Sequence, residues 1–327
     1  MEGITTGMKM FMEGNPRLKY AFFGGKGGVG KTALSAAAAL WSARRGGRTL
    51  LASTNPVHGL SDLFGQDLLG KPRPVCSEER YHALEIDTSV TTERSKQQTR
   101  EKIDWFLKTA GITTRAEEFI ESAGMNPSFE ESAMFEAMMD LIFADEYDFY
   151  VFDTGPFAIT RRLLGMSKVY SLWVERMLKS REAARSLREA LSFSKKQEKD
   201  PLMEYLTGLR ERIANGERLL FDNGLTALFC VTLPESLPIA VTKKLIDWSC
   251  GLGIPVGGVI VNGVIEKGES SERTAEFVRN RIAKQEEHLA EIRSLFGDRV
   301  RAVTPLFETE VRGGAMLERM SEYLFAQ

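Results

Sequence analysis

The chain has 327 residues, of which 43% are hydrophobic and 27% charged, and these proportions are typical of a globular protein with a sizeable buried core. Its formal net charge of −2 argues against nucleic acid or an anionic membrane surface as a partner. Three widely spaced cysteines form neither a disulfide framework nor a CxxC metal site, and no apolar run approaches the roughly 20 residues that span a bilayer. The N-terminus also lacks the apolar segment of a signal peptide, so we expect a cytoplasmic protein without an integral membrane segment.

The predicted elements begin with a short apolar strand from Leu18 to Phe23, which leads into a group of glycines. An alanine-rich helix is expected from about Gly30 to Arg45, where two further glycines end it. The next strands are expected from Arg48 to Ser53 and from His82 to Asp87. This alternation of strand and helix predicts a parallel sheet with helices on both faces.

The rest of the chain continues this pattern with two helical interruptions. Residues Thr91 to Ala144 and about Arg161 to Glu217 have helical patterns, and strand character returns between them from Asp148 to Asp153. The last predicted strands run from Leu225 to Val231, Val256 to Asn262 and Arg299 to Thr304.

These elements predict the fold class. We expect a doubly wound, mostly parallel α/β sheet of the P-loop NTPase type, in a single domain that covers residues 1–327. The two helical interruptions, at about 91–145 and 161–220, are expected to form one inserted helical subdomain above one end of the sheet.

A phosphate-binding pattern lies between the first predicted strand and the first helix, where GKGGVGKT matches GxxxxGK[ST]. Glycines allow successive backbone N–H groups to turn toward phosphates, and the helix N-terminus adds partial positive charge. Lys31 is expected to neutralise the β- and γ-phosphates, and the Thr32 hydroxyl is expected to bind Mg²⁺. The residues predicted to hold ATP are Gly25, Lys26, Gly27, Gly28, Val29, Gly30, Lys31 and Thr32.

Asp153 is the second predicted contributor to the Mg²⁺ site. Its carboxylate stands at the end of an apolar strand, within reach of a phosphate-bound Mg²⁺ through a bridging water. The alternative is an ordinary strand-terminal aspartate that caps the next turn. The neighbouring Thr154 and Pro156 favour the magnesium interpretation.

Further segments carry a resemblance to a known family: Tyr147 to Leu164 (YDFYVFDTGPFAITRRLL), Pro234-Glu235 in VTLPES, Asn262 in GVIVNGV and Pro305 to Gly313 (PLFETEVRG). With the extra lysine of the phosphate-binding pattern, Lys26, they resemble the ArsA-type ATPases in order and over nearly the whole chain. That family includes arsenite-pump ATPases and targeting factors for tail-anchored membrane proteins.

The resemblance implies roles for particular residues. Asn262 is similar to the family's adenine-recognising asparagine, while Pro305 and Phe307 belong to a loop that closes over the base. Glu235 lies in the matching loop after a late strand. Lys26 is the lysine that reaches across a dimer interface to the partner's nucleotide, which implies a homodimer; the alternative is a solvated loop lysine.

Two segments depart from the family pattern. The first switch usually reads DPAHN or DPAHS, whereas this chain has NPVHG from Asn55 to Gly59. The second usually reads DTAPTGHTL, whereas this chain has DTGPFAITRR from Asp153 to Arg162. The CxxC that holds zinc across a targeting-factor dimer would fall near Ala275 and Val278, and neither residue type binds a metal.

Asn55 stands where the family has a catalytic aspartate. An asparagine can hydrogen-bond the attacking water but cannot act as a base, and the loss of a general base typically costs about 10²–10⁴ in rate. We therefore expect a slow ATPase with Asn55, Lys26 and Lys31 as its catalytic set. Asn55 is either an introduced substitution that traps the ATP state or a native residue of a diverged branch. The departures in both switch segments favour the second alternative.

The function remains open among several hypotheses. The first is an ATP- and Mg²⁺-dependent switch that couples nucleotide state to a hydrophobic protein client, including a membrane-protein partner. The Met- and Phe-rich stretch from Phe129 to Phe143 suits either a client groove or, as favoured, the core, and Glu175 to Arg212 is more polar than a client lid. The alternatives are a non-hydrolysing nucleotide-binding scaffold and, less favoured by the cysteine pattern, an arsenite-pump ATPase subunit or a metal-cluster maturation factor.

Overall fold

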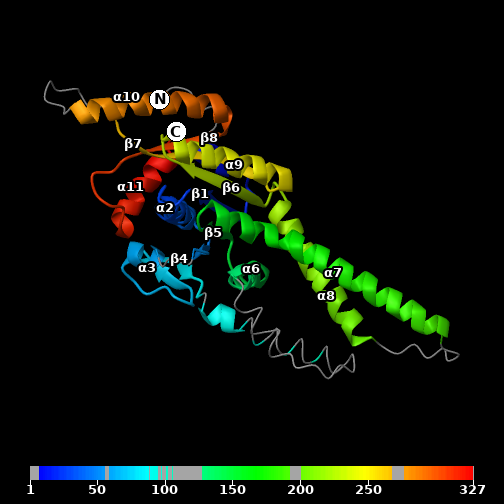
Figure 1. Cartoon of the computed structure of the whole chain (residues 1–327). Coiled ribbons are helices and arrows are strands. Elements are labelled where there is room, and N and C mark those ends of the chain that lie inside the picture. Colours follow the sequence, from blue (N-terminus) through cyan, green and yellow to red (C-terminus); the bar gives the residue numbers. More distant parts are fainter. Residues whose placement is uncertain are drawn as a thin grey trace. The chain divides into compact units, whose positions relative to one another are not determined.

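The structure is a computed structural model (Figure 1). It describes residues 7–55, 59–87, 89–94, 97, 101, 105, 127–191, 200–266 and 276–326. Within these residues the strands are β1 (Tyr20–Gly25), β2 (Thr49–Ser53), β3 (Arg73–Val75), β4 (Glu78–Glu85), β5 (Phe149–Asp153), β6 (Thr226–Thr232), β7 (Val256–Val264) and β8 (Val300–Pro305). The helices are α1 (Met8–Gly14), α2 (Lys31–Arg44), α3 (Gly59–Phe64), α6 (Pro127–Ala144), α7 (Phe157–Leu191), α8 (Pro201–Phe221), α9 (Ser236–Leu252), α10 (Glu276–Phe296) and α11 (Gly313–Leu324).

The strands form one sheet in the order β3-β4-β2-β5-β1-β6-β7-β8. All neighbours pair in parallel except β3 and β4, which pair antiparallel at the edge. The predicted α/β fold with a mostly parallel sheet is therefore confirmed. The edge strand β3 was not expected from the sequence, because it is three residues long and contains Pro74, and a proline is tolerated at a sheet edge.

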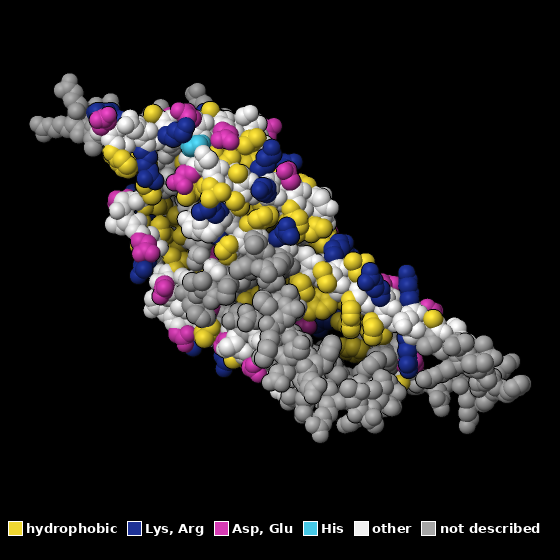
Figure 2. Space-filling view, viewed as in Figure 1, with side chains coloured by type: hydrophobic (Ala, Val, Ile, Leu, Met, Phe, Trp, Pro, Cys, Tyr) yellow, Lys and Arg dark blue, Asp and Glu magenta, His cyan; other side chains and the backbone are white. Residues whose placement is uncertain are grey.

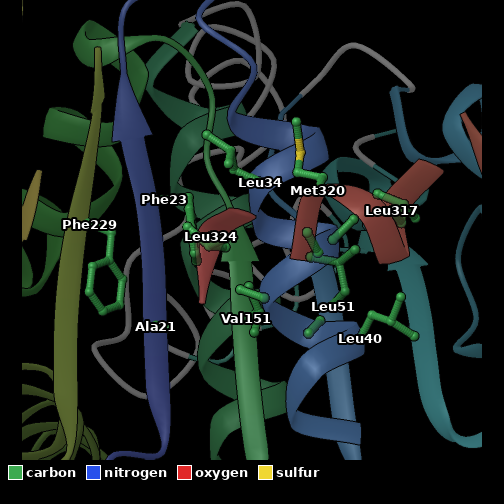
Figure 3. Packing of buried hydrophobic residues seen from close by; sticks show 14 of the residues in the cluster. Ala21, Phe23, Leu34, Leu40, Leu51, Val151, Phe229, Leu317, Met320 and Leu324 are labelled. Atoms are coloured by element: carbon green, nitrogen blue, oxygen red, sulfur yellow. The ribbon is translucent and has the colours of Figure 1, made fainter. Parts of the chain in front are cut away.

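Helix α2 forms the centre of the core because its side chains are small. Most of its alanines are fully buried, so the helix lies close to the strands on one side and to α11 on the other. Figure 3 shows Leu34 and Leu40 of α2 among residues of the sheet and of α11. Trp41 of α2 stacks on Phe325, with 4.1 Å between ring centroids.

The chain divides into two compact units. The first contains the sheet and comprises Met1–Asp87, Asp140–Arg161 and Phe221–Gln327, and the second comprises Thr88–Met139 and Arg162–Leu220. The described part of the second unit is helical and has a small core of its own, formed by Val174, Leu178 and Leu206. Residues 106–126, part of the predicted helical stretch, lie outside the described residues.

The Met- and Phe-rich stretch forms most of α6, and its described side chains are largely buried. Met134, Phe135, Met138, Met139 and Ile142 are each at most 6% exposed. This agrees with the core interpretation of the stretch. None of the helices described is both long and apolar enough to cross a membrane. On the face shown in Figure 2, basic and acidic side chains are interspersed, as the small net charge leads one to expect.

Candidate functional site

The predicted site residues of the sheet unit gather where the parallel strands end, at their carboxyl ends. Gly25 and Asp153 end β1 and β5, Asn55 follows β2 by two residues, and Asn262 and Pro305 lie near the ends of β7 and β8. Because the strands are parallel, their carboxyl ends lie along the same edge. This is the edge at which open α/β sheets bind their ligands.

The loop between β1 and α2 follows a path that only glycine permits at two positions. Gly25 has φ +156°, and a Cβ there would lie 2.4 Å from the carbonyl oxygen of Val231. Gly30 has φ +88°, and a Cβ there would lie 2.2 Å from Nδ2 of Asn262. The loop therefore packs directly against the ends of β6 and β7. Among the described residues no side chain caps the start of α2, so there its first N–H groups are available to an anion.

Lys31 is buried inside this loop. Its side chain is 6% exposed, and its ammonium donates a hydrogen bond of 3.0 Å to the carbonyl oxygen of Lys26. Burial lowers the pKa of Lys31, and the charge of Asp153 partly opposes this effect. A buried cation that donates to one carbonyl and feels the charge of one nearby carboxylate gains strongly from an anionic ligand.

Thr32 and Asp153 form a pair that fits a divalent cation. The Thr32 hydroxyl donates a hydrogen bond of 2.8 Å to Oδ2 of Asp153, whereas Oδ1 of Asp153 is buried without a hydrogen-bond partner among the described residues. Burial raises the pKa of Asp153 to about 6. The hydrogen bond from Thr32 and the charge of Lys31 lower this pKa, whereas the charge of Glu85 raises it further. Hydroxyl and carboxylate oxygens suit Mg²⁺, which usually completes its coordination with phosphate and water.

The described part also shows why such an ion would depend on a nucleotide. It contains no group of three or more His, Cys, Asp or Glu side chains placed to hold a metal. Thr32 and Asp153 alone supply too few ligands for an octahedral cation. The remaining ligands would have to come from phosphate oxygens and water.

The two described ends of the first switch segment lie beside Asp153 and Thr32. The backbone N–H of Thr54 donates to the carbonyl oxygen of Asp153 at 2.9 Å, and that of Asn55 donates to Oγ of Ser53 at 3.2 Å. At the other end, a Cβ on Gly59 would lie 3.7 Å from Cγ2 of Thr32. Residues 56–58, which include the histidine of the switch, lie outside the described residues.

The second switch segment is held by two buried threonines. The Thr154 hydroxyl donates to the carbonyl oxygen of Phe23 at 2.7 Å and lies 2.8 Å from that of Thr160. Thr160 in turn donates to the carbonyl oxygen of Gly155 at 2.8 Å. The segment after Asp153 is thus tied to β1. A Cβ on Gly27 would lie 3.8 Å from Pro156, so this segment borders the phosphate-binding loop.

Asn262 connects this loop to β7 and β8. Its Nδ2 donates to the carbonyl oxygen of Val29 at 2.9 Å, and its Oδ1 accepts a hydrogen bond of 2.6 Å from Thr304. The sequence did not indicate Thr304, because a threonine in a strand is usually a structural residue. The Thr304 contact fixes the orientation of the Asn262 amide. It therefore determines whether the amide oxygen or the amide nitrogen faces a neighbouring group.

The other predicted base-site residues have contacts of their own. The half-exposed Glu235 precedes α9 and lies 3.8 Å from Arg281 of α10. Leu306, after Pro305, donates its N–H to the carbonyl oxygen of Val264 at 2.8 Å. Phe307 packs on Tyr323 of α11, with 5.7 Å between ring centroids. Their roles in binding a base remain predictions.

Comparison with known proteins agrees with this arrangement. The profile of the ArsA_ATPase family, the anion-transporting ATPases, matches residues 18–326. A protein of Aquifex aeolicus (strain VF5) named as an arsenical pump-driving ATPase is 31% identical, over 94% of this chain and 99% of its own. ATPase ASNA1 homolog 2 of Paramecium tetraurelia is 28% identical, over 95% and 94%, and ATPase GET3A of Arabidopsis thaliana is 31% identical, over 93% and 83%. The chain therefore belongs to the ArsA family of ATPases.

Proposed function

We propose that this protein is an ATP-binding, Mg²⁺-dependent nucleotide switch that hydrolyses ATP slowly. The observation that carries the proposal is the pair formed by Thr32 and Asp153 beside the buried Lys31. Three groups that suit a metal–phosphate complex meet there, and Oδ1 of Asp153 is left without a partner among the described residues. The names of three related proteins, all ATPases, support the activity.

The proposed chemistry assigns a task to each group. Backbone N–H groups from Gly25 to Thr32 bind the phosphates, and Lys31 neutralises the charge that develops on the transferred phosphoryl group. Thr32, and Asp153 through a bridging water, would hold Mg²⁺, which would polarise the phosphate oxygens when bound. Asn55 hydrogen-bonds the attacking water and orients it. Because its amide cannot take the proton, the rate remains low.

We further propose that the protein acts as a homodimer in which Lys26 of each subunit reaches the nucleotide of the other. This assignment rests on the resemblance of GKGGVGKT to the family's loop. The backbone carbonyl of Lys26 accepts a hydrogen bond from the Lys31 ammonium, so the side chain of Lys26 is not needed to close its own loop.

The client of the switch is proposed to be a hydrophobic protein segment of the tail-anchored membrane-protein type. The helical unit, Thr88–Met139 and Arg162–Leu220, is the proposed client-binding subdomain of a single ATPase domain. On its helix α7, Val169, Leu172 and Trp173 are at least half exposed, and such large apolar side chains suit an apolar ligand. A nucleotide-binding scaffold without useful turnover is the competing function.

Small-angle scattering tests the switch. We expect the dimer to become more compact with Mg²⁺ and ATP than with Mg²⁺ and ADP or without nucleotide, because in this proposal the γ-phosphate, which ADP lacks, would contact both switch segments. Lys31→Met is the matched control, since it removes the phosphate contact and should abolish the change. The same scattering profile in all three states would show that the protein is not such a switch.

A further inference from the structure

A buried carboxylate outside the predicted site holds the start of α3. Glu85, the last residue of β4, is 2% exposed. Its Oε1 accepts hydrogen bonds from the backbone N–H groups of Leu60 and Ser61 at 2.7 Å and 3.1 Å. Its Oε2 accepts a hydrogen bond of 2.7 Å from the Ser61 hydroxyl. All three donors belong to the first turn of α3, which begins at Gly59.

The backbone of Glu85 is fixed on both sides. On one side it pairs with Ser53 of β2. On the other, its N–H donates to Leu68 and its carbonyl accepts from Gly70, each at 2.9 Å. A buried charge is costly unless it is fully hydrogen-bonded, and a fixed backbone limits how far the carboxylate can move to find other donors. Glu85 is therefore a rigid point to which α3 is attached.

This attachment acts on the candidate site through Gly59. A Cβ on Gly59 would lie 3.7 Å and 3.8 Å from Cγ2 and Oγ1 of Thr32. The start of α3 thus has Glu85 as its anchor and the predicted Mg²⁺ ligand Thr32 as its neighbour. The sheet register places Glu85, Ser53 and Asp153 in one row across β4, β2 and β5.

The same row holds the other end of the first switch segment. Thr54 donates its N–H to the carbonyl oxygen of Asp153 at 2.9 Å, one residue before Asn55. Asn55 therefore follows the sheet beside Asp153, and Gly59 begins α3, whose first turn Glu85 holds.

We propose that Glu85 is a positioning residue for ATP hydrolysis. By holding the first turn of α3, its carboxylate fixes the Gly59 end of the switch segment, and so the place of Asn55 relative to the phosphate-binding loop. The Glu85 carboxylate accepts hydrogen bonds from the first turn of α3 and not from the predicted Mg²⁺ ligand Thr32, whose hydroxyl donates to Asp153. This inference rests on the proposed slow ATPase activity, and it adds a residue that hydrolysis needs but nucleotide binding does not.

Four variants separate positioning from simple stabilisation. Glu85→Ala removes the three described contacts of the carboxylate, whereas Ser61→Ala removes only the Ser61 hydroxyl, which donates to Glu85 and also accepts a hydrogen bond from the Leu68 N–H. Glu85→Gln keeps an amide oxygen that can still accept from both N–H groups. Glu78→Ala changes a glutamate at the opposite end of the same strand, where it pairs with Arg44, and is the matched control.

Single-turnover hydrolysis with saturating Mg²⁺ and ATP is measured beside the dissociation constant for ATP. We expect Glu85→Ala to hydrolyse about 10–100 times more slowly, as expected for a displaced reacting group, with an ATP dissociation constant within about threefold of the original. Glu85→Gln should recover most of the rate, Ser61→Ala should be intermediate, and Glu78→Ala should be unchanged. An unchanged rate in Glu85→Ala, or a rate that falls only in step with ATP binding, would overturn the inference. Should Glu85→Ala fail to fold, Ser61→Ala decides by the same two criteria.

A second readout decides the inference if the original protein hydrolyses no ATP, which would refute the proposed activity instead. Hydrogen exchange is followed over residues 54–61 with and without Mg²⁺ and a non-hydrolysable ATP analogue. We expect the analogue to protect this segment in the original protein and in Glu85→Gln, but not in Glu85→Ala. Equal protection in all three proteins would overturn the positioning role.

Discussion

The Thr32 hydroxyl donates a hydrogen bond of 2.8 Å to Oδ2 of Asp153, although 121 residues separate the two in sequence. The contact joins the start of α2 to the end of β5. The sheet order places β5 beside β1, and α2 follows β1 in the chain. Two groups that the sequence predicted as Mg²⁺ ligands are therefore already side by side. Their arrangement leads to the first two predictions.

Removing the Thr32 hydroxyl should weaken the Mg²⁺-dependent part of ATP binding. Thr32→Val has nearly the same shape but offers no oxygen, so we expect ATP affinity with Mg²⁺ to fall by about tenfold or more, the scale of one lost charge-assisted contact. Affinity without Mg²⁺ should change little, because backbone N–H groups and Lys31 remain. Titration calorimetry with and without Mg²⁺ measures both, and Thr32→Ser is the control. Equal losses under the two conditions would contradict the assignment of Thr32 to the metal.

The stability of the nucleotide-free protein should depend on Asp153. Burial raises the pKa of this carboxyl from 3.8 to about 6. Between these values the native state binds more protons than the unfolded state, so this group's contribution makes the free energy of unfolding fall as pH rises. At pH 8 the shift of about 2 units corresponds to about 3 kcal/mol, which Asp153→Asn should regain. Denaturant unfolding at pH 5 and pH 8 checks this, with the exposed Asp247→Asn as control.

Mg²⁺ binding should show the opposite dependence on pH. The metal needs the charged carboxylate, so Mg²⁺-dependent ATP affinity should rise from pH 5 to pH 7, and saturating Mg²⁺ should move the midpoint to lower pH. Asp153→Asn should lose the part of this dependence that comes from the protein, and should keep the part that comes from the last proton of the terminal phosphate of ATP, whose pKa is about 6. A midpoint that stays fixed at every Mg²⁺ concentration would contradict a role for Asp153 in holding the ion.

Two of the loop's glycines with positive φ, Gly28 and Gly30, should differ in their tolerance of alanine. Gly28 and Gly30 have φ of +79° and +88°, but a Cβ meets nothing within 4 Å at Gly28 and lies 2.2 Å from Asn262 at Gly30. Both variants bear the left-handed strain, while only Gly30→Ala also displaces the Asn262 amide from Val29 and Thr304. We expect Gly30→Ala to lose about 1–3 kcal/mol more free energy of unfolding than Gly28→Ala. Equal losses would show that the Asn262 contacts contribute nothing to the loop.

Mixing two inactive variants should restore activity if Lys26 acts across a dimer. In a mixed dimer of Lys26→Ala and Lys31→Met, the site on the first subunit keeps its own Lys31 and receives Lys26 from the second. Hydrolysis should therefore reappear at one of two sites, whereas each variant alone should be about 10³-fold or more below the original, as for a lost cationic group at a phosphoryl-transfer site. Mixtures as inactive as the separate variants would place Lys26 in its own site or in none.

The parts of the fold that could be predicted are those with strong local patterns. The buried strands β1, β2 and β5 are short apolar runs bounded by glycine or polar residues, and their observed limits lie within two residues of the predicted ones. The edge strand β3 has no such pattern, because Pro74 and its exposed neighbour disguise it. Strand β4 starts at Glu78, four residues before the predicted start, because its exposed beginning pairs only with β3.

The same distinction holds for the site. A glycine-rich loop with a lysine is visible in sequence because its chemistry lies in adjacent residues. The contact between Asn262 and Val29 spans 233 residues, and Glu85 touches α3 from another strand. Such contacts depend on strand order and on side-chain direction, which no local pattern contains. Glu85 in HALEID is the only charged residue of this apolar strand end before Asp87. A charged residue at such a position is rarely buried without partners, and this signal in the sequence could have identified Glu85.

The central claim is that Asn55 slows hydrolysis in a site that is otherwise complete. Single-turnover hydrolysis with Mg²⁺ and saturating ATP, compared between the original protein and Asn55→Asp, tests it most directly. A slow but measurable rate is predicted for the original protein, and an acceleration of about 10²–10⁴ for the variant, because the aspartate restores a general base. An unchanged rate in Asn55→Asp would contradict the claim and place the limit in the altered second switch.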